Sequence, residues 1–133
     1  MGKFLAIIVL GALAGCASYV QTSDPALAHT TMKFEYLGCS GALSLGDSYK
    51  TVISREDHGT TTTFQVRHAA TCGLDVRRPA YSVSDGKLVL TYEMYSKNDG
   101  VVMCDCSYSS RFTFSNLPGS VESTSFTPIA DER

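Results

Sequence analysis

Apolar and polar side chains alternate with a period of two along several short stretches, and this pattern limits the fold more than any other feature. Phe64, Val66 and His68 alternate with Gln65 and Arg67. The same alternation recurs in three further stretches, at residues 32–36, 88–94 and 111–114. Successive side chains of a β-strand point to opposite faces, so such a strand has one buried face and one wet face. The pattern therefore predicts an all-β fold.

Turn-forming residues separate these stretches, at 57–59, 84–86, 98–100 and 117–119. Each group contains Gly with Asp, Asn or Pro, which are residue types that tolerate positive φ or preset a turn. Short strands joined by such turns, about seven or eight in number, are typical of a sandwich. We predict an antiparallel, immunoglobulin-like β-sandwich over residues 31–133.

Two β-hairpins follow from the turn chemistry. Asp85 and Gly86 are expected to close the first, because Asp-Gly is a favoured two-residue hairpin turn. Residues 97–100 are expected to close the next, which would pair Leu88–Ser96 with Val101–Cys106.

The chain opens with the layout of a secretory signal. Lys3 supplies a positive start, residues 4–13 are almost wholly apolar, and small residues lead to Cys16. The apolar run is shorter than the roughly 20 residues that a transmembrane helix needs. We predict a helical signal peptide over residues 1–15. Its ending, Leu13-Ala14-Gly15-Cys16, resembles the lipobox of bacterial lipoproteins.

This resemblance implies where the protein resides. Cleavage would fall before Cys16, which would carry acyl chains such as palmitate, and residues 16–30 would form a lipidated tether. Several acyl chains give a stable membrane anchor. Ala17-Ser18 lacks the aspartate that retains such lipoproteins in the inner membrane, so the outer membrane, facing the periplasm, is implied. In a bacterium with one membrane, the same signal implies the outer face of the cell membrane.

Four cysteines follow Cys16, namely Cys39, Cys72, Cys104 and Cys106. Thiols tend to pair in the oxidising compartments that exported proteins reach, and four cysteines suit two disulfides in three possible pairings. A bond across Cys104-Asp105-Cys106 would close a very small, strained ring. Cys104 and Cys106 are therefore expected to bond separately to Cys39 and Cys72, in an order that the sequence leaves open.

A metal or redox site is the alternative use of these residues. His68 and Cys72 would share one face of an extended strand, and Cys104 and Cys106 would share one face of another. Thiolate and imidazole ligands suit Zn²⁺ or Cu⁺. Structural zinc sites usually have two to four residues between paired cysteines, which Cys-x-Cys does not match. A reactive thiol needs nearby positive charge, and Asp105 opposes that. We expect disulfides, with no metal or other cofactor.

Residues 64–119 also resemble part of a loosely defined group of small secreted bacterial lipoproteins. The motifs that carry the resemblance are His68-x₃-Cys72, the strand at 88–93, Cys104-x-Cys106, the alternation at 112–114 and the turn at 117–119. The resemblance implies an immunoglobulin-like sandwich, and it implies no activity.

Known catalytic motifs are missing from the sequence. It has no Gly-x-Ser-x-Gly elbow, no His-Glu-x-x-His and no phosphate-binding or dinucleotide-binding glycine motif. The net charge is −2, and Arg77-Arg78 is the single adjacent basic pair. We interpret this pair as a solvated strand end, and the charge pattern argues against nucleic acid as a partner.

The sequence therefore favours a non-enzymatic binding or structural module over a catalyst. Its partner would be another envelope protein or a small envelope ligand, in addition to the membrane that holds Cys16. Tyr92, Tyr95 and Tyr108 are candidate exposed aromatic residues for that contact. Glu93 is expected on the wet face of its strand.

Overall fold

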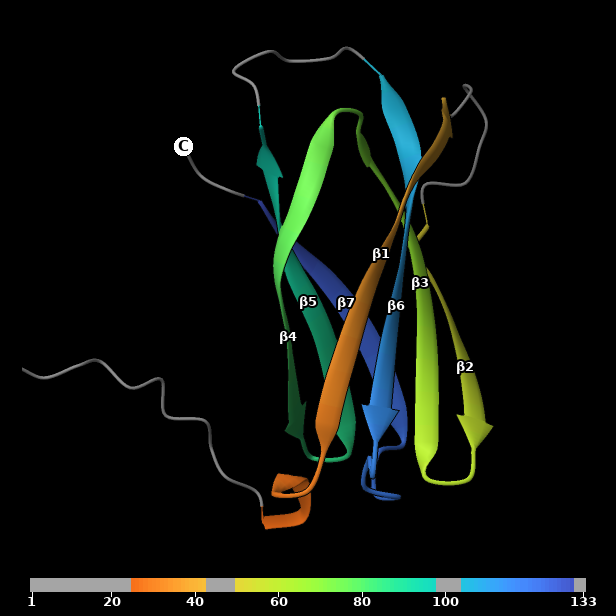
Figure 1. Cartoon of the computed structure of the whole chain (residues 1–133), viewed down its shortest axis with the longest axis vertical. Helices are drawn as coiled ribbons and strands as arrows, with labels where there is room; N and C mark the ends of the chain where they lie inside the picture. The colour runs from red at the N-terminus through yellow and green to blue at the C-terminus, as the bar shows by residue number, and fades with distance from the viewer. Residues whose placement is uncertain (1–24, 43–49, 98–103, 131–133) are drawn as a thin grey trace, which may run out of the picture.

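The computed structural model describes residues 25–42, 50–97 and 104–130. They form a short 3₁₀ turn and seven strands in two facing sheets, as Figure 1 shows. In chain order the elements are η1 (Pro25–Leu27), β1 (Thr31–Ala42), β2 (Val52–His58), β3 (Thr61–Thr71), β4 (Leu74–Ser84), β5 (Lys87–Ser96), β6 (Asp105–Ser115) and β7 (Ser123–Ala130). The predicted signal peptide, Cys16 and the first part of the tether lie outside the described residues.

The two sheets differ in size and in strand direction. One has four strands in the order β1-β6-β3-β2, and the other has three in the order β4-β5-β7. All the pairings are antiparallel except that of β5 with β7, which is parallel. The predicted all-β sandwich is confirmed, whereas a purely antiparallel arrangement is wrong. Parallel neighbours need a crossover connection, and here β6 supplies it by passing through the opposite sheet between β5 and β7.

The core lies between the sheets and follows the predicted alternation. Its large, fully buried side chains come from β3, β5 and β6: Phe64, Val66, Leu88, Leu90, Tyr92, Tyr108, Phe112 and Phe114. Burying one such apolar side chain stabilises the fold by about 1.5–3 kcal/mol. β1 lies at an edge of its sheet, and its apolar residues Met32, Phe34 and Tyr36 are only partly buried against the same core.

The first predicted hairpin is present and the second is not. Asp85 and Gly86, both with positive φ, join β4 to β5, as a favoured two-residue hairpin turn requires. β5 has β4 on one side and β7 on the other, while β6 lies in the opposite sheet between β1 and β3. The pairing of Leu88–Ser96 with the stretch ending at Cys106 is therefore wrong, because both edges of β5 are already occupied. Residues 98–103, which include most of the turn predicted at 97–100, lie outside the described ranges.

Prolines occupy both edges of the three-stranded sheet. Pro79 lies within a bulge of β4, between Arg77 and Ala80, and Pro128 lies in β7. Proline has no N–H to donate to an added strand, and bulges twist an edge away from new partners. These features protect the edges from pairing with further strands.

Candidate functional site

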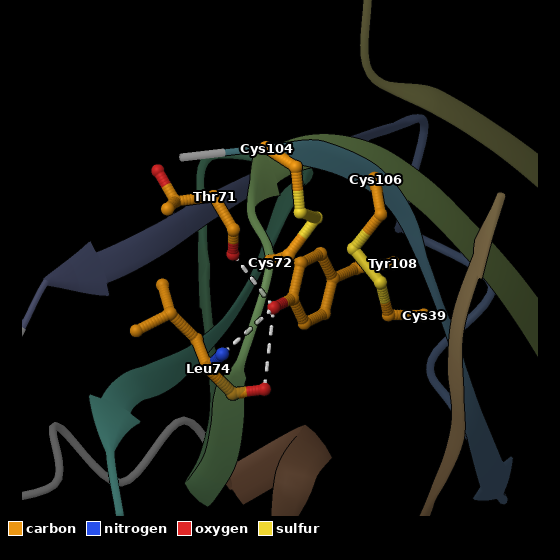
Figure 2. The surroundings of a disulfide bond; sticks show 7 residues. All are labelled: Cys39, Thr71, Cys72, Leu74, Cys104, Cys106 and Tyr108. Carbon is orange, nitrogen blue, oxygen red and sulfur yellow. Dashed lines mark hydrogen bonds between the residues drawn. A yellow bond between two sulfur atoms is a disulfide. The ribbon is translucent and has the colours of Figure 1, made fainter. Parts of the chain in front are cut away.

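The most distinctive chemistry in the described structure lies where β3 ends and the chain crosses to β4 in the other sheet. Cys72 and Gly73 form this turn. Gly73 has a φ of +81°, in the left-handed region that glycine adopts most readily. Two disulfides and a tyrosine hydroxyl gather beside the turn (Figure 2). We call this group the disulfide corner; its members are Cys39, Cys72, Cys104, Cys106 and Tyr108.

The disulfides join Cys39 to Cys106 and Cys72 to Cys104, with Cα–Cα distances of 5.8 and 5.4 Å. This confirms the prediction of two bonds in which Cys104 and Cys106 have separate partners. The first bond links edge strand β1 to β6. The second links the end of β3 to the residue before β6, where the Cys72 N–H also donates a 2.7 Å hydrogen bond to the Cys104 carbonyl. The closed loops span 67 and 32 residues, so each bond stabilises the fold by about 3–5 kcal/mol in the chain-entropy account.

The Tyr108 hydroxyl holds the turn from inside. It donates to the Thr71 carbonyl at 2.8 Å, accepts the Leu74 N–H at 3.1 Å and lies 3.2 Å from the Leu74 carbonyl. Figure 2 shows these three contacts converging on one oxygen. Buried backbone groups need such partners. Burial also raises the pKa of Tyr108 above its usual value, so the hydroxyl stays protonated and available as a donor.

The two disulfides lie against each other. The sulfur atoms of Cys39, Cys72 and Cys106 are all within 4.8 Å of one another. Cys39 is exposed, Cys72 is half-buried and Cys106 is buried. The structure thus brings together three members of the alternative metal set, Cys72, Cys104 and Cys106, and adds Cys39 to them in place of His68. Sulfur in a disulfide is not a thiolate, the form that binds soft metals.

His68 lies in the core between the sheets. Its Nε2 is 2.5 Å from the Tyr92 hydroxyl, and its ring packs against Tyr108 and Phe126 at centroid distances of 5.7 and 4.9 Å. Burial lowers the pKa of His68 below its usual value, because a charged ring would lose its hydration there. His68 is therefore a neutral core residue that joins the two sheets through Tyr92.

Arg77 and Arg78 hold Glu93 on the outer face of the three-stranded sheet. The Arg77 and Arg78 guanidinium groups lie 2.5 and 2.9 Å from the two Glu93 oxygens, and Arg77 also lies over the Tyr95 ring, 4.5 Å from its centroid. These hydrogen bonds, chiefly that from Arg77, keep the pKa of Glu93 below its usual value. The interpretation of the arginine pair as a strand end is wrong, because both residues lie within β4 and face a partner on β5.

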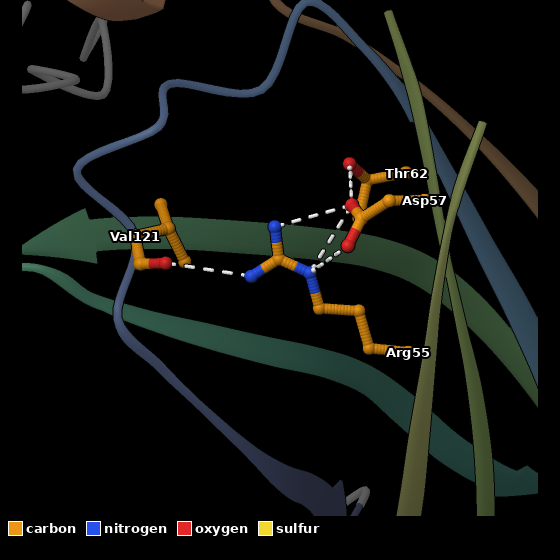
Figure 3. Close-up of polar contacts among 4 residues, drawn as sticks. All are labelled: Arg55, Asp57, Thr62 and Val121. Carbon is orange, nitrogen blue, oxygen red and sulfur yellow. Dashed lines mark hydrogen bonds and ion pairs between the residues drawn. The ribbon is translucent and has the colours of Figure 1, made fainter. Parts of the chain in front are cut away.

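A second arginine–carboxylate ion pair lies on β2, in the four-stranded sheet. Arg55 Nε lies 2.9 Å from an oxygen of Asp57, whose other oxygen accepts a 2.7 Å hydrogen bond from the Thr62 hydroxyl. Arg55 also donates to the Val121 carbonyl at 3.4 Å, as Figure 3 shows. The Arg55 and Thr62 hydrogen bonds lower the pKa of Asp57. The hydrogen bond from Arg55 connects edge strand β2 to the segment that leads into β7 of the opposite sheet, which is a structural role.

The three tyrosines predicted to be exposed divide differently. Tyr92 and Tyr108 are fully buried, so the prediction is wrong for both. Tyr92 shares the period-two face of Leu88 and Leu90, and that face points into the core. Tyr95 is half-buried on the outer face, where its hydroxyl lies 3.4 Å from Asp75.

We expect Tyr108→Phe to lower the free energy of unfolding by about 1–3 kcal/mol, because the partly buried Leu74 N–H loses its acceptor. The measurement is denaturant unfolding with both disulfides intact. Tyr95→Phe removes a hydroxyl from a longer contact on the outer face and should change the stability by about 0.5 kcal/mol or less. Equal effects of the two substitutions would contradict the role assigned to Tyr108.

We expect His68 to make stability depend on pH below neutrality. Its pKa is lower in the folded state than the unfolded value of about 6.5, so the unfolded chain takes up the proton first as the pH falls. Its contribution is complete above about pH 6.5 and is lost as the pH falls toward the folded pKa. The lowered pKa values of Asp57, Asp75 and Glu93 produce a separate loss of stability in the more acidic range, where carboxylates protonate.

Unfolding curves measured across pH 5–7 test this dependence, with His68→Gln as the variant that should flatten it. His58→Gln is the matched control, because His58 is exposed at the end of β2. A slope in this range that survives His68→Gln would contradict the assignment.

The chain matches no protein-family model, no curated protein and no solved structure. Among residues 25–42, 50–97 and 104–130, no helix has the length and apolar character needed to cross a membrane.

Proposed function

We propose that the protein is a lipid-anchored bacterial envelope lipoprotein whose β-sandwich acts as a non-catalytic binding or structural module. The observation that carries the proposal is the pairing of Cys39, Cys72, Cys104 and Cys106 in two disulfides. Such bonds suit a protein that is exported to an oxidising compartment. Of the chain's five cysteines, Cys16 alone then remains for modification, and it ends the lipobox-like segment.

The anchor places the domain at a membrane surface. Cleavage after residue 15 would leave a lipidated Cys16 and a tether that ends where β1 begins at Thr31. The end of this tether is held at the domain, where Thr30 Oγ1 donates to the Asn116 carbonyl at 2.9 Å. We place the protein at the outer membrane facing the periplasm, or at the outer face of the cell membrane where there is one membrane. Nucleic acid and a cofactor form no part of the proposal.

We also propose that the domain is immunoglobulin-like in the way its two sheets pack as layers. Constant-type immunoglobulin domains also divide seven strands into sheets of four and three. Their first two strands are neighbours in one sheet, whereas β1 and β2 lie at opposite edges of the four-stranded sheet. We therefore propose likeness in the stacking of the layers and not in the order of the strands.

Two features support a non-catalytic role. The carboxylates with lowered pKa values, such as Asp57 and Glu93, are engaged by arginines of the same sheet. His68, the buried histidine, is hydrogen-bonded within the core to Tyr92. A catalytic acid or base needs a titrating atom within hydrogen-bond reach of a substrate, and these groups instead stabilise the domain.

The anchor is tested by expressing the full chain in a bacterium with two membranes and supplying labelled palmitate. We expect label in the protein and recovery with the outer membrane. Cys16→Ser should abolish the label, because the acylated sulfur is gone, and should move the protein out of the membrane fraction. Labelling that persists in Cys16→Ser, or wild-type protein free of label, would overturn the proposal.

Of the three candidate tyrosines, Tyr95 is the one that reaches the surface, so we propose that it contacts the partner protein. Aromatic side chains and arginine are enriched in protein interfaces, and Tyr95 lies against Arg77. We expect cross-linking in intact cells to join the anchored protein to an envelope protein, with the adduct lost in Tyr95→Ala. Val52→Ala is the control, since Val52 is an exposed apolar residue of the other sheet. An adduct that is equally strong in both variants would argue against a contact at Tyr95.

A metal or redox role based on His68, Cys72, Cys104 and Cys106 is the second candidate. The close sulfur group formed by Cys39, Cys72 and Cys106 favours sulfur chemistry at the corner. The Tyr92 hydrogen bond of His68 argues against a role for that ring. Metal bound to protein recovered from the periplasm would favour this candidate, and fully oxidised, metal-free protein would favour the module.

A further inference from the structure

We infer that the disulfide corner is a thiol–disulfide exchange site that accepts electrons from an external dithiol, such as a pair of exposed thiols on a reduced protein. The juxtaposition that carries the inference is the approach of Cys39, Cys72 and Cys106 sulfurs within 4.8 Å of one another. Two separate disulfides supply these three atoms. A thiolate released from one bond therefore lies beside a sulfur of the other.

Exposure decides where an external thiolate attacks. Among the four cysteines of the corner, Cys39 alone is exposed, and its partner Cys106 is 1% exposed. Exchange rates depend on access to the attacked sulfur. The external thiolate therefore attacks Cys39 Sγ, a mixed disulfide forms, the Cys39–Cys106 bond breaks, and Cys106 leaves as a thiolate.

The second step completes the reduction of that bond. The second thiolate of the dithiol attacks the dithiol sulfur that is bonded to Cys39 in the mixed disulfide. This forms the intramolecular disulfide of the oxidised dithiol and releases Cys39. The dithiol has lost two electrons, and Cys39 and Cys106 have gained them. The two protons of the dithiol pass to the protein thiols, so atoms and charge balance.

The third step breaks the other disulfide, Cys72–Cys104. The thiolate of Cys39 or Cys106 attacks Cys72 Sγ, a new bond to Cys72 forms, and Cys104 leaves and is protonated. This step exchanges partners without further oxidation or reduction. Its result is that the bond beside the β3–β4 turn opens although the external reductant touched only Cys39.

Two variants that remove the same disulfide test the exchange. Cys104→Ser leaves the Cys72 thiol within reach of both Cys39 and Cys106, whereas Cys72→Ser leaves the Cys104 thiol, which lies outside the group of three close sulfurs. Both variants lose the same cross-link, so its loss affects the stability of both alike. The full-length chain carries Cys16→Ser in each case, so that no other thiol takes part.

Non-reducing peptide mapping after trapping with a thiol-alkylating reagent gives the readout. In Cys104→Ser we expect a new cross-link from the tryptic peptide 68–77 to 34–50 or to 98–111, which reports Cys39–Cys72 or Cys72–Cys106. In Cys72→Ser, a second cleavage before Asp105 places Cys104 and Cys106 in different peptides. There we expect Cys39–Cys106 as the only disulfide. Overturning results are a Cys72 thiol that stays fully alkylated in Cys104→Ser, or equal exchange in the two variants.

The protein with all four corner cysteines provides a second test that does not depend on how the variants fold. It is treated with one equivalent of dithiothreitol and then alkylated. We expect a species with alkylated Cys104 and a new bond to Cys72. The inference would be overturned if every product had one native disulfide reduced and the other native disulfide intact.

Discussion

The structure depends on the fastening of the β3–β4 turn, where the chain leaves one sheet and enters the other. The Cys72–Cys104 bond fixes the turn to the start of β6, and the Tyr108 hydroxyl satisfies its backbone groups from within. The Cys39–Cys106 bond then secures edge strand β1 to the same region of β6. A small domain buries a limited fraction of its surface, so cross-links worth about 3–5 kcal/mol each are comparable with its whole stability of about 5–15 kcal/mol.

β6, one of the two inner strands of the four-stranded sheet, supplies much of this fastening. Cys106 and Tyr108 alternate with outward-facing residues along β6, so both point toward the core, one to a disulfide and one to the turn. Phe112 and Phe114 continue this face into the aromatic core. β6 therefore contributes both to the core and to the disulfide corner. Sulfur exchange at Cys39 would act on the fold at the point where the sheets are joined.

The period-two alternation predicted the buried face of the strands in which it occurs, and it did so correctly at Phe64, Leu88 and Phe112. It could not reveal which sheet a strand joins, because alternation is the same in either sheet. The wrong partner for Leu88–Ser96 and the unexpected parallel pairing of β5 with β7 both follow from this limit. The Asp85-Gly86 hairpin was predictable because its turn chemistry is local.

The site was predictable in its residue types and not in its geometry. Two disulfides with separate partners for Cys104 and Cys106 followed from ring strain, whereas the pairing itself depends on strand order. The alternative metal set included His68 and left out Cys39, whereas Cys39 belongs to the close sulfur group, because distances across a sheet cannot be read from sequence. Tyr108 illustrates the same limit, since a buried tyrosine at a turn and an exposed one at an interface look alike in sequence.

The role of the two disulfides is tested most directly by a disulfide map of the protein recovered from the envelope of a bacterium that expresses the full chain. Trypsin followed by cleavage before Asp105 separates Cys104 from Cys106. We expect bonds Cys39–Cys106 and Cys72–Cys104, with a domain mass lower by about four hydrogens than that of the reduced domain. Free thiols at these positions with bound metal, or a Cys104–Cys106 bond, would contradict this pairing.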